Sequence, residues 1–238
     1  MAKQLYETFA SSKVTEGMLA EAATLFNENY GTWGDKSPKK GSPVRLSTRR
    51  LREQYLPDAA QSIYTRVTVD GVLAGNAFAC RWEHSGKAVC WVTQLVVSKD
   101  YRERGLATGL LRALRADDCH DIYGIMSSHP AACLAAAAAF STTVEKVSLD
   151  FISKNAQGVM RESPILYIRD AKLCGTIFDD SDSTGLVSGV NTDFFVDHEK
   201  PMQALKIIRE RLQWPLGELP DGHEYLLIVP AKSRRSRS

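Results

Sequence analysis

Apolar and polar positions alternate with the two-residue period of β-strands over the middle of the chain. Residues 63–69 (IYTRVTV) follow this pattern, and the Asp70-Gly71 pair directly after them is a strong hairpin signal. Residues 72–82 predict the returning strand, and a turn at Ser85-Gly86 leads into a third strand over residues 88–97. The pattern therefore predicts a meander of three antiparallel strands.

Helical periodicity marks the segments on both sides of this meander. Apolar residues recur at helical spacing over residues 15–30, and residues 47–55 predict a second, shorter helix. After the meander, the apolar run at residues 122–126 predicts a buried strand, and residues 130–140 predict an alanine-rich helix. Strands and helices in this order indicate an α/β protein in the wide sense, which includes α+β folds.

The C-terminal part of the chain mixes helical and extended patterns. We expect helices at residues 144–160 and 201–212. Residues 179–189 are rich in Asp, Ser, Thr and Gly and predict a flexible loop. Short apolar runs at residues 193–197 and 225–229 are candidates for two strands that close the sheet.

A polar connection with a glycine joins the third strand of the meander to the next helix. It reads Arg102-Glu103-Arg104-Gly105-Leu106-Ala107, and leucines at helical spacing follow. A loop at a helix N-terminus directs several backbone N–H groups to one point, where the helix dipole adds positive charge. Gly105 has no Cβ, so the backbone can approach a ligand or adopt a positive φ. We expect a pyrophosphate site here; the alternative is an ordinary strand–turn–helix unit with surface arginines.

The spacing Arg102-x-x-Gly105-x-Ala107, after Gln94-Leu95-Val96-Val97, resembles the acetyl-CoA motif of the GNAT superfamily of N-acyltransferases. The resemblance implies that acetyl-CoA is the acetyl donor, with its pyrophosphate on the amides of residues 102–108. It also implies that the pantetheine arm runs beside residues 95–97, where a backbone N–H polarises the thioester carbonyl. The implied contact residues are Leu95, Val96, Val97, Arg102, Glu103, Arg104, Gly105, Leu106, Ala107, Thr108 and Ser128.

The same resemblance implies a central mixed, mostly antiparallel sheet flanked by helices. The chain departs from the family in its length, and we expect a C-terminal helical insertion. We expect a cofactor-binding core at residues 1–140, and a helical insertion with a flexible loop at residues 141–192, where no established module is recognisable. Closing strands with a helix are expected at residues 193–230, and a disordered basic tail at residues 231–238.

The predicted helix at residues 130–140 departs from the family pattern. Counting back from Phe140 puts Ser128 where the family usually has Asn, and Ala135 where it usually has a Tyr that protonates the departing thiolate. Alanine has no proton to donate. The general acid is therefore open, and a water or another side chain is needed in this role.

Three residues are candidates for the general base or for orienting a water. His129 follows a predicted strand end and opens a helix, where its imidazole is expected to stay neutral. Glu83 ends the strand that leads into the hairpin, which is also where solvated residues belong. Gln94 lies on the cofactor strand and could orient a water, although an amide is no useful proton acceptor.

The connection between the first two helices covers the acceptor site in the family. Here it contains Tyr30 and Trp33, which are candidates for stacking on an apolar or aromatic amine, with a role as packing anchors as the alternative. Candidate carboxylates for an acidic acceptor pocket occur in the last segment, namely Asp197, Glu199, Glu218 and Glu224.

The composition of the chain limits the class of protein and its expected location. The chain has 238 residues, of which 44% are hydrophobic and 24% charged, as in ordinary globular proteins. It contains neither a long apolar run nor a signal-peptide pattern, so we expect no membrane partner and a cytoplasmic protein. The basic tail keeps a nuclear location open. The five scattered cysteines predict neither a disulfide framework nor a metal site.

The net charge of +2 depends on the tail. Without its four basic residues, the chain has 26 Lys and Arg against 28 Asp and Glu, so nucleic acid is not an expected partner. We expect an N-acetyltransferase that moves acetyl from acetyl-CoA to a primary amine of a small molecule by direct attack. The alternatives are a protein or peptide acceptor, or a non-catalytic acetyl-CoA-binding protein. A homodimer stays open.

Overall fold

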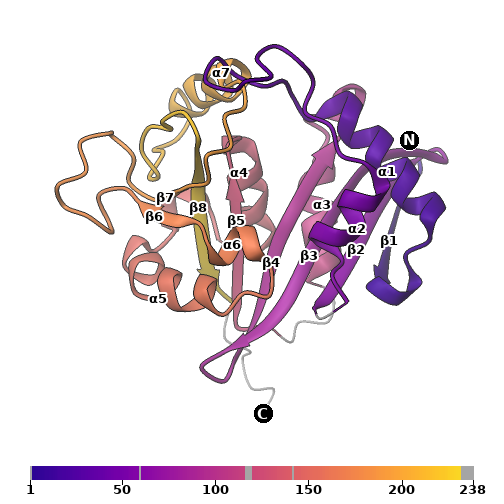
Figure 1. Cartoon of the computed structure of the whole chain (residues 1–238), viewed down its shortest axis with the longest axis horizontal. Coiled ribbons are helices and arrows are strands. Elements are labelled where there is room, and N and C mark those ends of the chain that lie inside the picture. The colour runs from indigo at the N-terminus through magenta and orange to yellow at the C-terminus, as the bar shows by residue number, and fades with distance from the viewer. Residues whose placement is uncertain (1, 59, 116–119, 141, 232–238) are drawn as a thin grey trace.

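A computed structural model describes residues 2–58, 60–115, 120–140 and 142–231 of the chain. Within them, eight strands form one sheet in the order β1-β2-β3-β4-β5-β8-β7-β6 (Figure 1). The strands are β1 (Gln4–Ala10), β2 (Gln61–Val69), β3 (Val72–His84), β4 (Lys87–Val97), β5 (Ile122–Ser127), β6 (Lys172–Cys174), β7 (Gly189–Asn191) and β8 (His223–Pro230).

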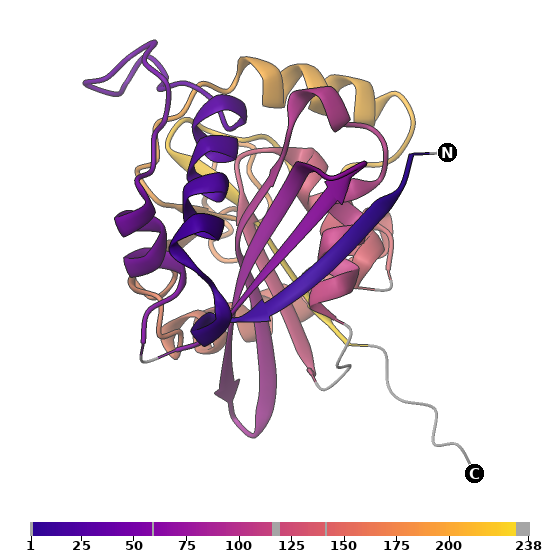
Figure 2. The same cartoon turned by 90° about the vertical axis from the view of Figure 1, so that its right-hand side faces the viewer.

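Helices cover both faces of this sheet (Figure 2). They are α1 (Glu16–Asn29), α2 (Thr48–Tyr55), α3 (Leu106–Leu114), α4 (Pro130–Ala139), α5 (Leu149–Arg161), α6 (Leu166–Arg169) and α7 (Glu199–Arg209). One face carries α1, α2, α5 and α6, and the other carries α3 and α4, with α7 packed on α4. The predicted mixed, mostly antiparallel sheet flanked by helices is thus confirmed.

All neighbouring strands are antiparallel except β4 and β5, which run parallel over a short register from Val89–Ile122 to Val92–Ile125. The predicted meander is β2-β3-β4, and its first turn at Asp70-Gly71 has positive φ at both residues, as the hairpin signal requires. The last long strand, β8, inserts between β5 and β7.

Two hydrophobic clusters hold the layers together. The larger lies mainly between the sheet and α3, α4 and α5, and it includes Trp91, Tyr123 and Phe140. The rings of Tyr123 and Phe140 stack with centroids 4.2 Å apart. A Cβ at Gly124 would clash with the indole of Trp91, so only glycine allows that ring to lie flat on β5. The smaller cluster packs α1 and α2 onto β2, β3 and β4.

The prediction of a strand at residues 193–197 is wrong. Asp193 has a φ of +52°, which breaks the extended conformation, and only Val196 makes an isolated bridge, to Trp33. The strand beside β8 is β7, which begins at Gly189, the last residue of the predicted loop. The strand at residues 225–229 is confirmed as part of β8.

Two further elements differ from the sequence prediction. The helix expected at residues 144–160 is divided, because Ser148 caps α5 by accepting a hydrogen bond from the Phe151 N–H after a 3-10 turn at Val144–Lys146. The strand β1 was not predicted; it lies at the sheet edge, so few of its side chains are buried and its pattern is weak.

Strands from the predicted core, insertion and closing segment all belong to one sheet. The sheet therefore does not separate the three parts, and their division stays a prediction. Apart from Ala231, the predicted basic tail lies outside the described residues, as does Cys119. Cys80 and Cys133 are buried free thiols. No helix among the described residues is both long enough and apolar enough to cross a membrane.

Candidate active site

The parallel strands β4 and β5 separate beyond Val92 and Ile125, where their pairing ends. A β-bulge causes this separation. Phe78 on β3 faces Gln94, and the next residue, Ala79, faces Val92, so Thr93 is an extra residue on β4. A bulge increases local twist and bends its strand. Residues 93–97 of β4 therefore have no strand partner on the side of β5, and an extended ligand can pair with that edge.

The loop after β4 forms an anion cradle. Glu103 and Gly105 have φ of +60° and +76°, and α3 begins immediately afterwards at Leu106. The backbone N–H groups of residues 103–108 donate to no acceptor among the described residues. A Cβ at Gly105 would meet nothing within 4 Å, so the space in front of these groups is open. The arrangement fits a pyrophosphate, as the sequence predicts.

The two arginines of this loop have different roles in the structure. Arg102 donates to the backbone carbonyls of Asn29 and Val97, at 2.7 and 3.3 Å, and burial lowers the pKa of its guanidinium. Its side chain therefore fastens the loop to α1 and β4, while phosphate contact through this guanidinium stays a prediction. Arg104 lies over the ring of Tyr101, 5.2 Å from its centroid.

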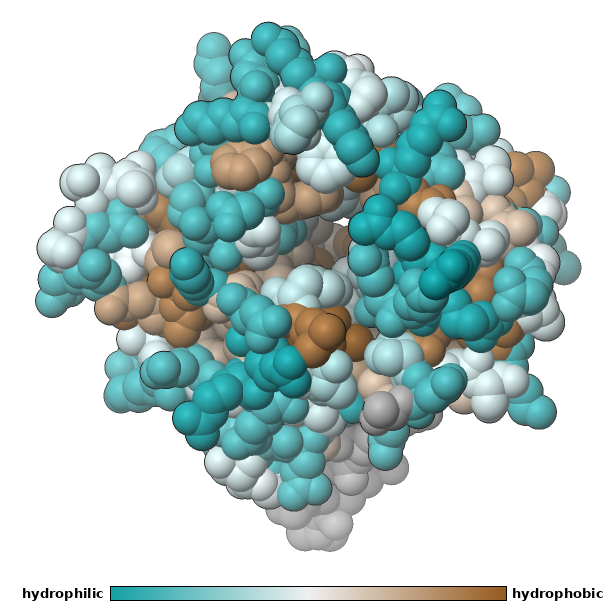
Figure 3. All heavy atoms as spheres, viewed as in Figure 1, coloured by the Kyte–Doolittle hydropathy of each residue, from teal (hydrophilic) through white to brown (hydrophobic). Residues whose placement is uncertain are grey.

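A cavity of about 310 Å³ lies where β4 and β5 separate, on the face that carries α1, α2 and α6. Figure 3 shows a recess near the centre of this face, with apolar atoms in its depth. The aromatic residues that line the cavity are Phe26, Tyr30, Trp33, Tyr55, Trp91, Tyr167 and Phe194. Its polar wall includes Gln94 and Glu224, and its charged residues on the helix side are Arg45 and Arg50.

The connection between α1 and α2 roofs the cavity and is held by the segment before α7. The Gly34 N–H donates to the Phe195 carbonyl at 2.8 Å, and the Asp197 N–H donates to the Thr32 carbonyl at 2.9 Å. The rings of Trp33 and Phe194 meet edge to face, with centroids 5.4 Å apart. These contacts place Trp33 and its neighbour Tyr30 in the cavity wall; their role in binding stays a prediction.

Glu224, on β8, is the carboxylate that the fold brings into the cavity. Its side chain faces the hollow and is half-buried, and this burial raises its pKa from the ordinary 4.5 to about 7, against the opposing effect of the Thr192 hydroxyl. A carboxylate whose pKa lies near 7 suits proton transfer at neutral pH. The other three predicted carboxylates, Asp197, Glu199 and Glu218, do not line the cavity.

Gln94 lies deep in the same cavity wall and is 6% exposed. Neither amide atom makes a hydrogen bond of good geometry, although Tyr55 is near enough for the amide to oppose the rise of the pKa of that phenol to about 12 on burial. Buried amides usually have partners. An amide left without one, beside a cavity, is available to a water or a ligand.

Tyr167 is a site residue that sequence reasoning missed. It lies on α6, and its hydroxyl donates to the carbonyl of the bulge residue Thr93 at 3.0 Å. Part of its ring is exposed, but the hydroxyl is enclosed, and burial raises its pKa well above the ordinary value. No pattern in residues 141–192 marks this tyrosine, because its role depends on how α6 packs.

The structure does not bring the other base candidates into the cavity. His129 caps α4, and its Nδ1 accepts from the Ala131 N–H at 3.2 Å. Burial, with Arg102 nearby, lowers the pKa of His129 to about 4, so it is a weak proton acceptor at neutral pH. Glu83 is exposed and pairs with Ala88 next to the hairpin turn. Ser128 is buried just outside the cavity lining.

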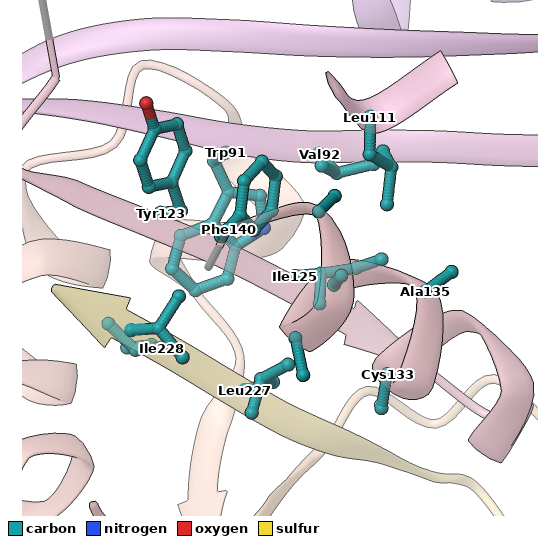
Figure 4. Packing of buried hydrophobic residues seen from close by; sticks show 14 of the residues in the cluster. Trp91, Val92, Leu111, Tyr123, Ile125, Cys133, Ala135, Phe140, Leu227 and Ile228 are labelled. Atoms are coloured by element: carbon teal, nitrogen blue, oxygen red, sulfur yellow. The ribbon is translucent and has the colours of Figure 1, made fainter. Parts of the chain in front are cut away.

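Ala135 lies on the inner face of α4 and contributes no polar group. It is buried with Cys133, Ile125 and Leu227 in the larger cluster (Figure 4). Counted from Phe140, this is the position where the sequence comparison expects a tyrosine hydroxyl. The described part of α4 therefore offers no hydroxyl there, and the phenolic hydroxyls of the cavity come from Tyr30, Tyr55 and Tyr167.

The first half of the chain resembles a known protein family. The model of the acetyltransferase (GNAT) family matches residues 22–140, which is half of the chain. A comparison with curated proteins gives no significant match. Among solved structures, the ribosomal-protein-S18-alanine N-acetyltransferase from Escherichia coli aligns with 14% identity and a TM-score of 0.35, over 51% of this chain and 66%, just under two thirds, of that enzyme.

Two more solved structures align over a similar part of the chain. An aminoglycoside acetyltransferase from an uncultured soil metagenomic sample has 13% identity and a TM-score of 0.36, over 48% of this chain and 68% of its own. A tandem GNAT protein from the clavulanic acid biosynthesis pathway has 14% identity and a TM-score of 0.39, over 52% of this chain and 36% of its own.

Proposed function

The chain belongs to the acetyltransferase (GNAT) family, and from this premise we propose that it transfers the acetyl group of acetyl-CoA to the primary amine of a small molecule. The observation that carries the proposal is the position of Glu224, whose carboxyl faces an enclosed cavity beside the separated edge of β4. Donor and acceptor would meet at that edge.

The donor side rests on the anion cradle and on the open strand edge. The free N–H groups of residues 103–108 would hold the pyrophosphate, and residues 95–97 would pair with the pantetheine arm. The bound thioester supplies an acyl group that is already activated. The chain then contributes mainly by holding donor and acceptor in position, which can account for a large part of the rate acceleration of acyl transfer.

The acceptor side must provide a neutral amine. An alkylamine is mostly protonated at pH 7, because its pKa is about 10.4. Glu224, as a carboxylate, would accept one proton from the ammonium group. The amine nitrogen then forms a bond to the acyl carbon, and the carbon–sulfur bond breaks. The nitrogen gives up its surplus proton, and the departing thiolate takes up one proton. Gln94 is suited to holding a water or the amine in line.

A small acceptor fits better than a protein. The roof made by residues 31–34 is hydrogen-bonded to residues 194–197, so the cavity is covered from above. Its volume of about 310 Å³ is at the lower end of the range for ligand pockets. A peptide acceptor would need an open groove across this roof.

The test is a thiol-release assay with a panel of amines, together with calorimetric titration of acetyl-CoA. We expect binding and amine-dependent thiol release, and we expect Glu224→Gln to keep acetyl-CoA affinity while turnover falls about a hundredfold, as for loss of a general base. Glu218→Gln, outside the cavity lining, is the matched control. Acetyl-CoA binding without release by any amine would favour the non-catalytic alternative.

A further inference from the structure

Two arginines beside the cavity lack the ion pairs that their neighbours have. On α2, Arg49 pairs with Glu53 at 2.7 Å, and Arg52 pairs with Glu16 at 2.6 Å. Arg50 and Arg45 line the cavity, and neither makes an ion pair with another described residue. Both are exposed, so they stand at the mouth of the cavity.

The negative and the positive groups that line the cavity come from different layers of the fold, with Glu224 on the sheet strand β8 and Arg50 on the covering helix α2. Burial raises the pKa of this phenol to about 12, Glu224 adds to the rise, and Arg50 opposes it. The electrostatic fields of Glu224 and Arg50 therefore both act on the Tyr55 hydroxyl. Between the carboxyl on β8 and the guanidinium groups on the helix side, the wall is largely aromatic, with Tyr30, Trp33 and Phe194 in the roof.

From this polarity, and resting on the function proposed above, we propose that the acceptor is a small amino acid whose amine and acidic group stand at opposite ends of an apolar or aromatic body. Its ammonium end faces Glu224, its body lies between the aromatic rings, and its carboxylate binds Arg45 and Arg50. Guanidinium groups bind carboxylates through paired hydrogen bonds. The same arginines repel an acceptor with a second positive charge, so di- and polyamines are disfavoured.

The test uses three probes that differ only at the far end of one ring. They are 4-(aminomethyl)benzoate, 4-methylbenzylamine and 1,4-bis(aminomethyl)benzene, with a negative, a neutral and a positive far end. We expect kcat/KM to be about tenfold higher for the benzoate than for the neutral probe, as for one charge-assisted hydrogen bond, and lowest for the diamine.

Variants assign this preference to the arginines. Arg50→Ala and Arg45→Ala should lower kcat/KM for the benzoate about tenfold more than for the neutral probe, since the charged contact is lost only with the benzoate. Arg50→Glu should reverse the order between benzoate and diamine. Arg49→Ala is the control, because Arg49 lies on the same helix but outside the cavity lining. Equal melting temperatures would show that every variant folds.

Calorimetric binding of the benzoate separates this inference from the proposed function. Equal kcat/KM for all three probes would overturn the inference while the acetyltransferase stands. Tight binding of the benzoate that depends on Arg50, without acetylation of any probe, would overturn the proposed function and support recognition of the acid-bearing amine. Benzoate binding no tighter than that of the neutral probe would overturn the inference.

Discussion

The hydroxyl of Tyr167 donates to the carbonyl oxygen of Thr93, with 3.0 Å between the two oxygens. Thr93 is the bulge residue that turns β4 away from β5, and Tyr167 belongs to α6, beyond the part of the chain that the family model matches. The segment after residue 140 thus supports the strand edge on which acyl transfer would take place.

Removing this hydroxyl should disturb the strand edge and leave the anion cradle intact. We expect Tyr167→Phe to lower kcat about fivefold, since one hydrogen bond contributes about 1 kcal/mol and its loss lets the bulge move. Acetyl-CoA affinity by calorimetry should not change. Tyr6→Phe is the control, because that hydroxyl hydrogen-bonds to the side chain of Gln4 and lies outside the cavity lining. An unchanged kcat would limit Tyr167 to packing.

The buried Glu224 should make stability fall as pH rises. Its pKa is raised from 4.5 to about 7 in the fold, so the folded state binds more protons than the unfolded state between these values. The favourable contribution of Glu224 to the free energy of unfolding is complete below pH 4.5 and is lost by about pH 7. Glu224→Gln should therefore be more stable than the wild type at pH 8, by up to about 3 kcal/mol.

Urea unfolding at pH 4.5 and pH 8 measures this effect. The gain of Glu224→Gln over the wild type should appear at pH 8 and vanish at pH 4.5. Glu218→Gln, at a carboxyl outside the cavity lining, should show no such difference between the two pH values. A gain of the same size at both pH values would mean that the glutamine acts through packing and that Glu224 is not a strained carboxylate.

The backbone at Gly105 should matter for acetyl-CoA more than for folding. Gly105 and Gly86 have φ of +76° and +73°, and a Cβ at either would meet nothing within 4 Å. Valine at either position should cost about 2 kcal/mol of stability, from the left-handed conformation alone. Only Gly105→Val should also weaken acetyl-CoA, by about tenfold or more, since its side chain enters the cradle. Calorimetry under conditions in which both variants are folded compares their affinities for acetyl-CoA. Equal affinities would refute the assignment of the cradle.

His129 should affect the stability of the fold at low pH and have little effect on turnover. Its pKa is lowered from 6.5 to about 4 in the fold, so its contribution is complete above pH 6.5 and is lost as pH falls towards 4. His129→Asn, which keeps a capping acceptor, should resist acid better than the wild type and keep kcat at pH 7 within about twofold. A hundredfold fall in kcat would restore His129 as the base.

Local patterns were enough to predict the meander, the loop at residues 102–107 and the helices around them. Each of these elements depends on residues close in sequence, such as Asp70-Gly71 for the hairpin or Gly105 at the start of α3. The family resemblance depended on the same loop. These parts were correct because their chemistry is local.

The cavity was harder to predict because distant segments build it. Glu224 was one of four candidate carboxylates, and its sequence environment did not distinguish it from Glu218. Its register opposite Val190 on β7 turns it into the hollow. Likewise, His129 had the expected position at a strand end, but its Nδ1 is already engaged by the Ala131 N–H, which no spacing rule indicates.

The sheet order has a consequence for how the chain is made. β5 pairs on one side with β8, so this edge of residues 122–127 has no strand partner until residues 223–230 have been synthesised. During synthesis, an apolar strand edge stays open while about a hundred further residues are added, at roughly 5–20 residues per second. Protection of this nascent edge, by a chaperone or by transient packing of α4, would then decide the yield of folded protein in the cell.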